Sequence, residues 1–82
     1  MRAVASKAQI LKEAGYLYSF DRAIYVNRAA RKVFSVEFIG DHDEAELEAA
    51  MRSPSPPPGE WQFFFNAAPS DSVKHDLSAV LG

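Results

Sequence analysis

The order of hydrophobic and polar residues predicts a short helix near the start of the chain. Within residues 6–15, apolar side chains recur at helical spacing, at Ile10, Leu11 and Ala14. Ser6 is a favourable N-cap at the beginning of this segment, with Gln9 at capping-box spacing. Gly15 can adopt the left-handed conformation that closes a helix, so we expect the helix to end there.

The next part of the chain has a period of two in place of the helical period. β-Branched and aromatic side chains dominate three segments, which we predict as strands: residues 16–20, 23–27 and 32–39. If Asp21 and Arg22 form a two-residue turn, Tyr18 pairs with Tyr25 and the side chains of each pair share one face of the sheet.

Helix and strand patterns alternate in the second half. We expect a second helix over residues 40–53, capped by Asp41 or Asp43, and a proline-rich extended loop over residues 54–60. A fourth strand is predicted over residues 61–66. A third helix is predicted over residues 70–82, with Ser70 as its cap and an apolar stripe at Val73, Leu77, Val80 and Leu81.

The resulting order is α-β-β-β-α-β-α, which predicts one small α+β domain over residues 1–82 with a proline-rich internal loop at 54–60. We expect two layers: a largely antiparallel sheet of about four strands with helices mainly on one face. A chain of 82 residues leaves a thin margin of stability. The chain has no cysteine, so a hydrophobic core must stabilise it, alone or together with a second subunit.

Strand alternation assigns the large side chains to two faces of this sheet. The face under the helices is expected to carry Leu17, Ile24, Val26, Phe34, Val36, Phe38, Trp61, Phe63 and Phe65. The second face is expected to carry Tyr16, Tyr18, Phe20, Tyr25, Val33, Ile39 and Phe64. An aromatic face of this size is covered by the first helix, by a second subunit, or by a distinct ligand or partner.

Charge is distributed unevenly along the chain, although the net charge is only −2. Residues 1–35 hold seven Lys and Arg against two Asp and Glu, whereas residues 36–82 hold two against nine. Four basic residues border the predicted turns: Arg22, Arg28, Arg31 and Lys32. Beside aromatic side chains such residues can bind phosphate, but nucleic-acid-binding domains are usually basic overall. The alternatives are solvated turn charges or complementarity to an acidic helix.

No segment carries a diagnostic catalytic, cofactor or metal motif. Asp41, His42, Asp43 and Glu44 are contiguous, so a helix would point them in different directions, and helix capping explains the acids. His75 is the other histidine, four residues after Asp71. We therefore predict no catalytic residue, no metal site and no cofactor, and an enzyme is the least supported class.

The sequence favours a non-enzymatic interaction module that binds a protein partner or a second copy of itself. The predicted partner-binding residues are Tyr16, Tyr18, Tyr25, Phe64, Arg22, Arg28, Arg31 and Lys32. A nucleic-acid-binding module that uses the same surface is the alternative. The chain lacks an apolar run of signal-peptide or membrane-spanning length, so we expect a cytoplasmic protein without a membrane partner.

Overall fold

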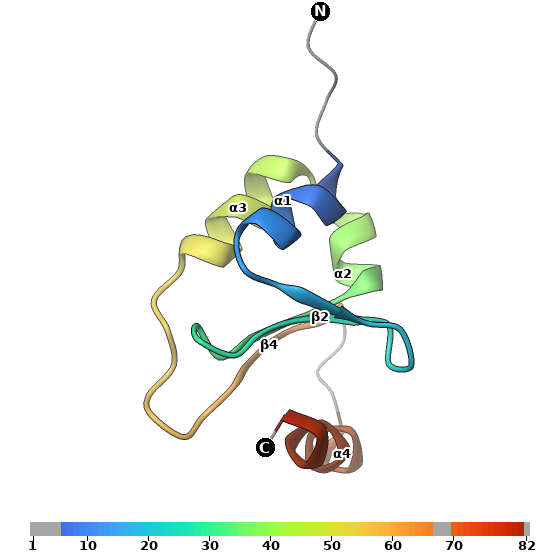
Figure 1. Cartoon of the computed structure of the whole chain (residues 1–82), viewed down its shortest axis with the longest axis vertical. Coiled ribbons are helices and arrows are strands. Elements are labelled where there is room, and N and C mark those ends of the chain that lie inside the picture. The colour runs from blue at the N-terminus through green and yellow to red at the C-terminus, as the bar shows by residue number, and fades with distance from the viewer. Residues whose placement is uncertain (1–5, 67–69, 82) are drawn as a thin grey trace, which may run out of the picture.

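The computed structural model describes residues 6–66 and 70–81, without the side chains at positions 78, 80 and 81 (Figure 1). Four helices and four strands follow one another in these residues. Their bounds are α1 Lys7–Glu13, β1 Leu17–Ser19, β2 Ile24–Asn27, β3 Lys32–Ser35, α2 Val36–Asp41, α3 Glu44–Arg52, β4 Gln62–Phe64 and α4 Asp71–Leu81.

The four strands form one sheet in the order β1-β2-β3-β4. The pairs β1–β2 and β2–β3 are antiparallel, whereas β3–β4 is parallel. The helices α1, α2 and α3 lie on one side of the sheet and α4 lies on the other (Figure 1). The predicted α+β fold with a mostly antiparallel four-stranded sheet and helices mainly on one face is confirmed.

Local capping explains where the helices begin. The Ser6 hydroxyl accepts a hydrogen bond from the Gln9 N–H, and Gly15 has a φ of 96°, as the helix prediction requires. Asp43 and Glu46 form a reciprocal capping box at the start of α3. These signals lie within a few residues of one another, so the sequence pattern identifies them.

The predicted strand over residues 32–39 is wrong in its second half. Strand β3 ends at Ser35, whose hydroxyl accepts a hydrogen bond from the Phe38 N–H (3.0 Å) and caps α2. The Lys7 ammonium donates to the carbonyl oxygens of Ile39 and His42 at the other end of α2. Tertiary contacts from a distant lysine thus stabilise a six-residue helix that is too short to be stable alone.

The predicted faces are wrong for the third strand, and the face of Ile24 and Val26, expected under most of the helices, packs against α4 alone among the described helices (Figure 1). The hairpin register is confirmed, since Tyr18 pairs with Tyr25, but the predicted two-residue turn is wrong because the turn spans residues 20–23. Tyr25 in turn pairs with Phe34. Phe34 therefore lies on the face of the sheet that carries Tyr18 and Tyr25, which we call the tyrosine face. Val33 pairs with Val26 and lies on the opposite face. A shift of one residue in the pairing of two strands moves every side chain of a strand to its other face. The loop at 28–31 sets the pairing of β2 with β3, and the sequence pattern does not determine it.

Two clusters of side chains form the core, one on each face of the sheet. The tyrosine face packs under α1, α2 and α3 around the buried residues Leu11, Tyr16, Phe34, Ile39 and Leu47. The opposite face packs against α4 around Ile24, Val26, Val33 and Leu77, with Trp61, Phe63 and Phe65 partly buried beside them. Trp61 therefore lies on the face opposite Phe34. It is half-buried, contrary to the expectation that both share one core.

The C-terminal helix begins as predicted, with the Ser70 hydroxyl accepting a hydrogen bond from the Val73 N–H. Leu77 of its predicted apolar stripe is buried, whereas Val73 is 41% exposed. Val80 and Leu81 lie outside the described side chains. Among the residues that the structure describes, no helix has the length and apolar character needed to cross a bilayer.

Candidate functional site

The structure separates the eight predicted partner-binding residues into two groups by their burial. Five are buried or half-buried within the subunit: Tyr16, Tyr25, Arg31, Lys32 and Phe64. Three are exposed on the β1–β2 hairpin or its flanking loops: Tyr18, Arg22 and Arg28. A surface that includes all eight residues is thus not open to a partner in this fold, and the exposed part lies along the hairpin.

Lys32 has an internal partner. Its side chain is only 1% exposed, and its ammonium donates hydrogen bonds to the carbonyl oxygens of Met51 (2.7 Å), Ala50 (3.2 Å) and Ser53. These oxygens lie at the C-terminal end of α3, where the helix dipole and unpaired carbonyls favour a cation. Burial lowers the pKa of Lys32 below its ordinary value of 10.5.

Arg31 also makes a contact within the chain. Its guanidinium donates to the carbonyl oxygen of Pro56 at 2.6 Å, in the proline-rich segment that follows α3. Arg31 itself has a φ of 55°, in the left-handed region, and ends the turn between β2 and β3. The basic turn therefore anchors the segment that connects α3 to β4.

The helix-covered part of the tyrosine face is an aromatic cluster. Phe34 is fully buried, meets the Tyr16 ring edge-on at 5.3 Å between centroids, and stacks on Phe64 at 4.5 Å. Tyr16 is 3% exposed, and burial raises its pKa to about 12. Of the expected coverings, the first helix therefore applies to this part of the face, and α1 covers it together with α2 and α3.

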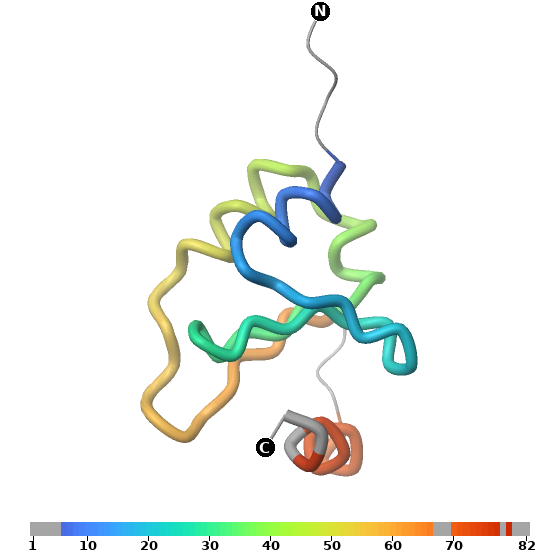
Figure 2. The backbone as a smooth tube through the Cα atoms, in the orientation of Figure 1, coloured from blue at the N-terminus to red at the C-terminus, as the bar shows by residue number. Residues whose placement is uncertain are grey.

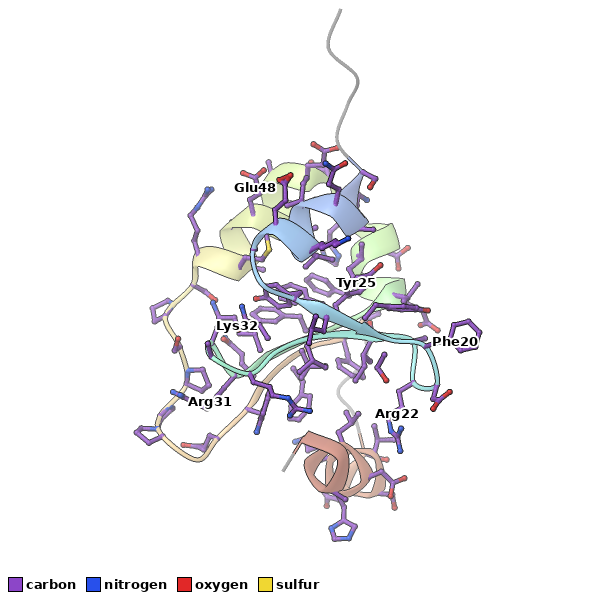
Figure 3. The ribbon with its side chains drawn as sticks, in the orientation of Figure 1. Phe20, Arg22, Tyr25, Arg31, Lys32 and Glu48 are labelled. Atoms are coloured by element: carbon purple, nitrogen blue, oxygen red, sulfur yellow. The ribbon has the colours of Figure 1, made fainter. Side chains whose placement is uncertain are left out.

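Three large apolar side chains remain exposed on or next to β1. Leu17 is 72% exposed, Tyr18 is 49% exposed and Phe20 is 83% exposed. Phe20 points away from the body of the protein at the tip of the hairpin (Figure 3), and Figure 2 shows that this tip projects beyond the sheet. We name these three residues the hairpin edge patch. Large exposed apolar side chains gathered along a sheet edge mark interaction surfaces.

The main chain of β1 is also open on one side, because β1 is an end strand of the sheet. The Val36 N–H donates to the Ala23 carbonyl at 3.0 Å, so the main chain of Ala23, next to the start of β2, points toward β3. Because the bonding direction alternates along β2, the main chain of Ile24 points toward β1, where it pairs with Ser19. The same alternation turns the N–H and C=O of Tyr18 away from β2.

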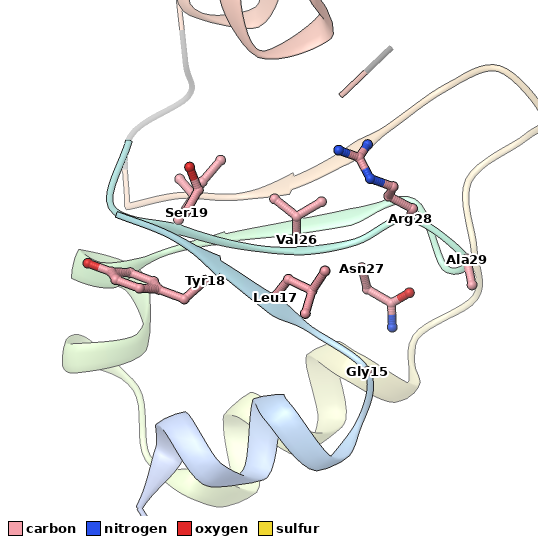
Figure 4. Close-up of a pocket in the computed structure, with 9 residues that line it drawn as sticks. Gly15, Leu17, Tyr18, Ser19, Val26, Asn27, Arg28 and Ala29 are labelled. Atoms are coloured by element: carbon pink, nitrogen blue, oxygen red, sulfur yellow. The ribbon is translucent and has the colours of Figure 1, made fainter. Parts of the chain in front are cut away.

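Two cavities flank this strand. One of about 410 Å³ lies beside β1 and β2 and is lined by Gly15, Leu17, Tyr18, Ser19, Ile24, Val26, Asn27, Arg28 and Ala29 (Figure 4). The other, of about 290 Å³, lies between α1 and β1 and is lined by Ala8, Lys12, Tyr16, Leu17, Tyr18 and Tyr25. Most of the lining of both is apolar, which suits apolar side chains of a partner more than a polar substrate.

The described residues contain no group of three or more His, Asp or Glu that could hold a metal ion. His42 stacks on the Phe38 ring at 3.9 Å between centroids, and its Nδ1 is 2.8 Å from the Phe38 carbonyl oxygen. These contacts give the imidazole a structural role at the end of α2.

Sequence reasoning missed Leu17, which it assigned to the core, and it did not include Phe20 in the predicted site. The register of the hairpin is correct, but Leu17 is exposed because it lies on an end strand. The strand order could have been expected from the short connections, which place β1, β2 and β3 as successive neighbours.

Comparison with known proteins adds no further assignment: a scan against protein-family models and searches of curated proteins and of solved structures find no match to this chain.

Proposed function

We propose that this chain is a non-enzymatic protein-interaction module that binds a protein partner or a second copy of itself through the hairpin edge patch. The observation that carries the proposal is the exposure of Leu17, Tyr18 and Phe20 along a strand whose outer main chain is unpaired by the sheet. An exposed apolar end strand is a template for pairing with another chain, and natural proteins usually protect it.

Charge near the patch supports a protein partner over a polyanion. Arg22 is exposed at the hairpin tip, but it is adjacent to the exposed Asp21. Lys32 and Arg31, which the nucleic-acid alternative requires, already bind carbonyl oxygens of α3 and of the proline-rich segment. The aromatic surface beside them is largely under helices. The second candidate function therefore has less support than the first.

Site-specific photo-crosslinking tests the proposed function. A photo-reactive phenylalanine analogue is placed at position 20 of the full chain, and the control carries it at Val73, which is exposed on the other side of the sheet. Both variants are irradiated in the cells from which the sequence comes. We expect discrete crosslinked protein species, of self or of another chain, from position 20 and not from position 73. The absence of such species from position 20 would contradict the proposal.

A further inference from the structure

We propose that two copies of this chain associate by antiparallel pairing of their β1 strands, with Phe20 of each copy inserted into the 290 Å³ cavity of the other. The inference deepens the proposed function and rests on it, because it names the partner of the hairpin edge patch. The observations that carry it are the direction of the Tyr18 main chain, the position of Phe20 and the position of that cavity.

The main chain determines the register of such a pair. Tyr18 is the central residue of β1 and directs its N–H and C=O away from β2. Two copies related by a two-fold axis beside Tyr18 can exchange two main-chain hydrogen bonds between their Tyr18 residues. Such an interface is isologous, since the same strand contributes to both sides. In this register Leu17 of one copy lies opposite Ser19 of the other, and Tyr16 lies opposite Phe20.

The side chains fit the same register. Phe20 lies on the tyrosine face, because its ring meets the Tyr18 ring edge-on at 6.4 Å between centroids. Residues that face each other across paired strands share a face, so Phe20 of the second copy reaches the side of the sheet on which Tyr16 lies. The cavity between α1 and β1 is on this side and is lined by Tyr16, Tyr18 and Ala8. A dry cavity of about 150 Å³ can hold a benzene ring, so the observed volume is sufficient.

Charges beside the strand are compatible with a second copy as the partner. Lys12 lines the cavity and is exposed, and Asp21 is exposed at the hairpin tip. Neither forms an ion pair with another described residue. In the antiparallel pair the hairpin tip of one copy, which carries Asp21, lies toward the Gly15 end of β1 in the other copy, near the last turn of α1, which contains Lys12. Two such attractions occur in one dimer, and both partners come from this chain.

Sedimentation equilibrium of the purified full chain tests the association at concentrations from about 10 to about 500 micromolar, the range of a small, weak interface. We expect a monomer–dimer equilibrium. Phe20→Ala removes the inserted ring and Ala8→Trp fills the cavity, so each variant should weaken the dimer at least about tenfold. Val73→Ala, an exposed apolar residue outside the interface, should leave it unchanged. A wild-type monomer throughout, or wild-type association of both variants, would overturn the inference.

A disulfide test checks the register, since the chain has no cysteine of its own. Tyr18→Cys brings two thiols together across the axis, whereas Ser19→Cys leaves them two residues out of register, beyond the roughly 7 Å between Cα atoms that a disulfide allows. We expect Tyr18→Cys to form a covalent dimer on mild oxidation much faster than Ser19→Cys. Circular dichroism of both variants confirms that they fold. Equal rates, or faster linkage of Ser19→Cys, would refute the two-fold pairing at Tyr18.

The two proposals can fail separately. If position 20 crosslinks to other proteins while the purified chain remains a monomer, self-pairing is wrong and the interaction function stands. If position 20 crosslinks to nothing and the chain remains a monomer, both are wrong. Crosslinking of position 20 to a second copy, together with linkage of Tyr18→Cys, supports both.

Discussion

The ammonium nitrogen of Lys32 lies 2.7 Å from the main-chain oxygen of Met51, so a strand residue caps the C-terminal end of a helix that begins twelve residues later in the sequence. Lys7 makes the corresponding contact with the Ile39 carbonyl at the end of α2, at 2.8 Å. Two lysines of the basic first half thus stabilise the ends of two helices of the acidic second half.

Replacing Lys32 should therefore reduce stability and not only affinity for a partner. In Lys32→Met the apolar stem is kept but the carbonyl oxygens of Ala50, Met51 and Ser53 lose their donor in a buried place. We expect a loss of about 2 kcal/mol or more in the free energy of unfolding, measured by urea denaturation. Lys12→Met, at an exposed lysine of α1, should change it by less than about 0.5 kcal/mol. Unchanged stability of Lys32→Met would exclude the capping role.

The buried Tyr16 side chain predicts a loss of stability in alkali. The pKa of Tyr16 is about 12 in the folded protein and 10.0 ordinarily, so the unfolded chain releases this proton first as pH rises. The contribution is complete below pH 10.0 and is lost between pH 10.0 and about 12, by roughly 2–3 kcal/mol in the limit.

The comparison with Tyr16→Phe isolates this effect. The pH dependence that Lys32 contributes to stability has the opposite sign. Because folding lowers the pKa of Lys32, its contribution makes stability rise with pH toward 10.5. Both proteins retain Lys32, so its contribution cancels in their difference. Urea denaturation at several pH values from 9 to about 11.5 measures the difference in the free energy of unfolding between the two proteins. A difference between the two proteins that stays constant across this range would contradict the raised pKa of Tyr16.

The core on the tyrosine face should be more sensitive to truncation than the core under α4. Phe34 is fully buried and its ring contacts those of Tyr16, Phe38 and Phe64, so Phe34→Ala should cost about 3–5 kcal/mol and unfold so small a protein. Trp61 is half-buried, so Trp61→Ala should cost less. Thermal denaturation followed by circular dichroism ranks the two. A larger loss in Trp61→Ala would reverse this assignment of the main core.

Nucleic acid should bind weakly or not at all, because Arg31 and Lys32 already have internal partners. Fluorescence anisotropy with single-stranded RNA, single-stranded DNA and duplex DNA at low salt should detect no complex at tens of micromolar protein. Tight binding that falls steeply with salt and weakens in Arg22→Ala and Arg28→Ala would instead support the nucleic-acid alternative.

Local signals in the sequence were sufficient for the features that depend on neighbouring residues. Ser6 and Gly15 mark the two ends of α1, and Asp43 and Glu46 form the capping box of α3. Tyr18 pairs with Tyr25 across one short turn over residues 20–23. Each depends on residues within a few positions of one another, so the pattern along the chain is enough to predict it.

Tertiary structure alone decided the features that depend on distant residues. Residues 36–39 alternate like a strand, but Ser35 and Lys7 stabilise a helix there, and the faces of β3 follow from its pairing with β2. The parallel placement of β4 beside β3 depends on the path of the intervening segment. The charge pattern along the sequence did not distinguish the buried Lys32 from the exposed Arg22. The burial of Lys32 depends on the helix end that its side chain reaches once the chain has folded.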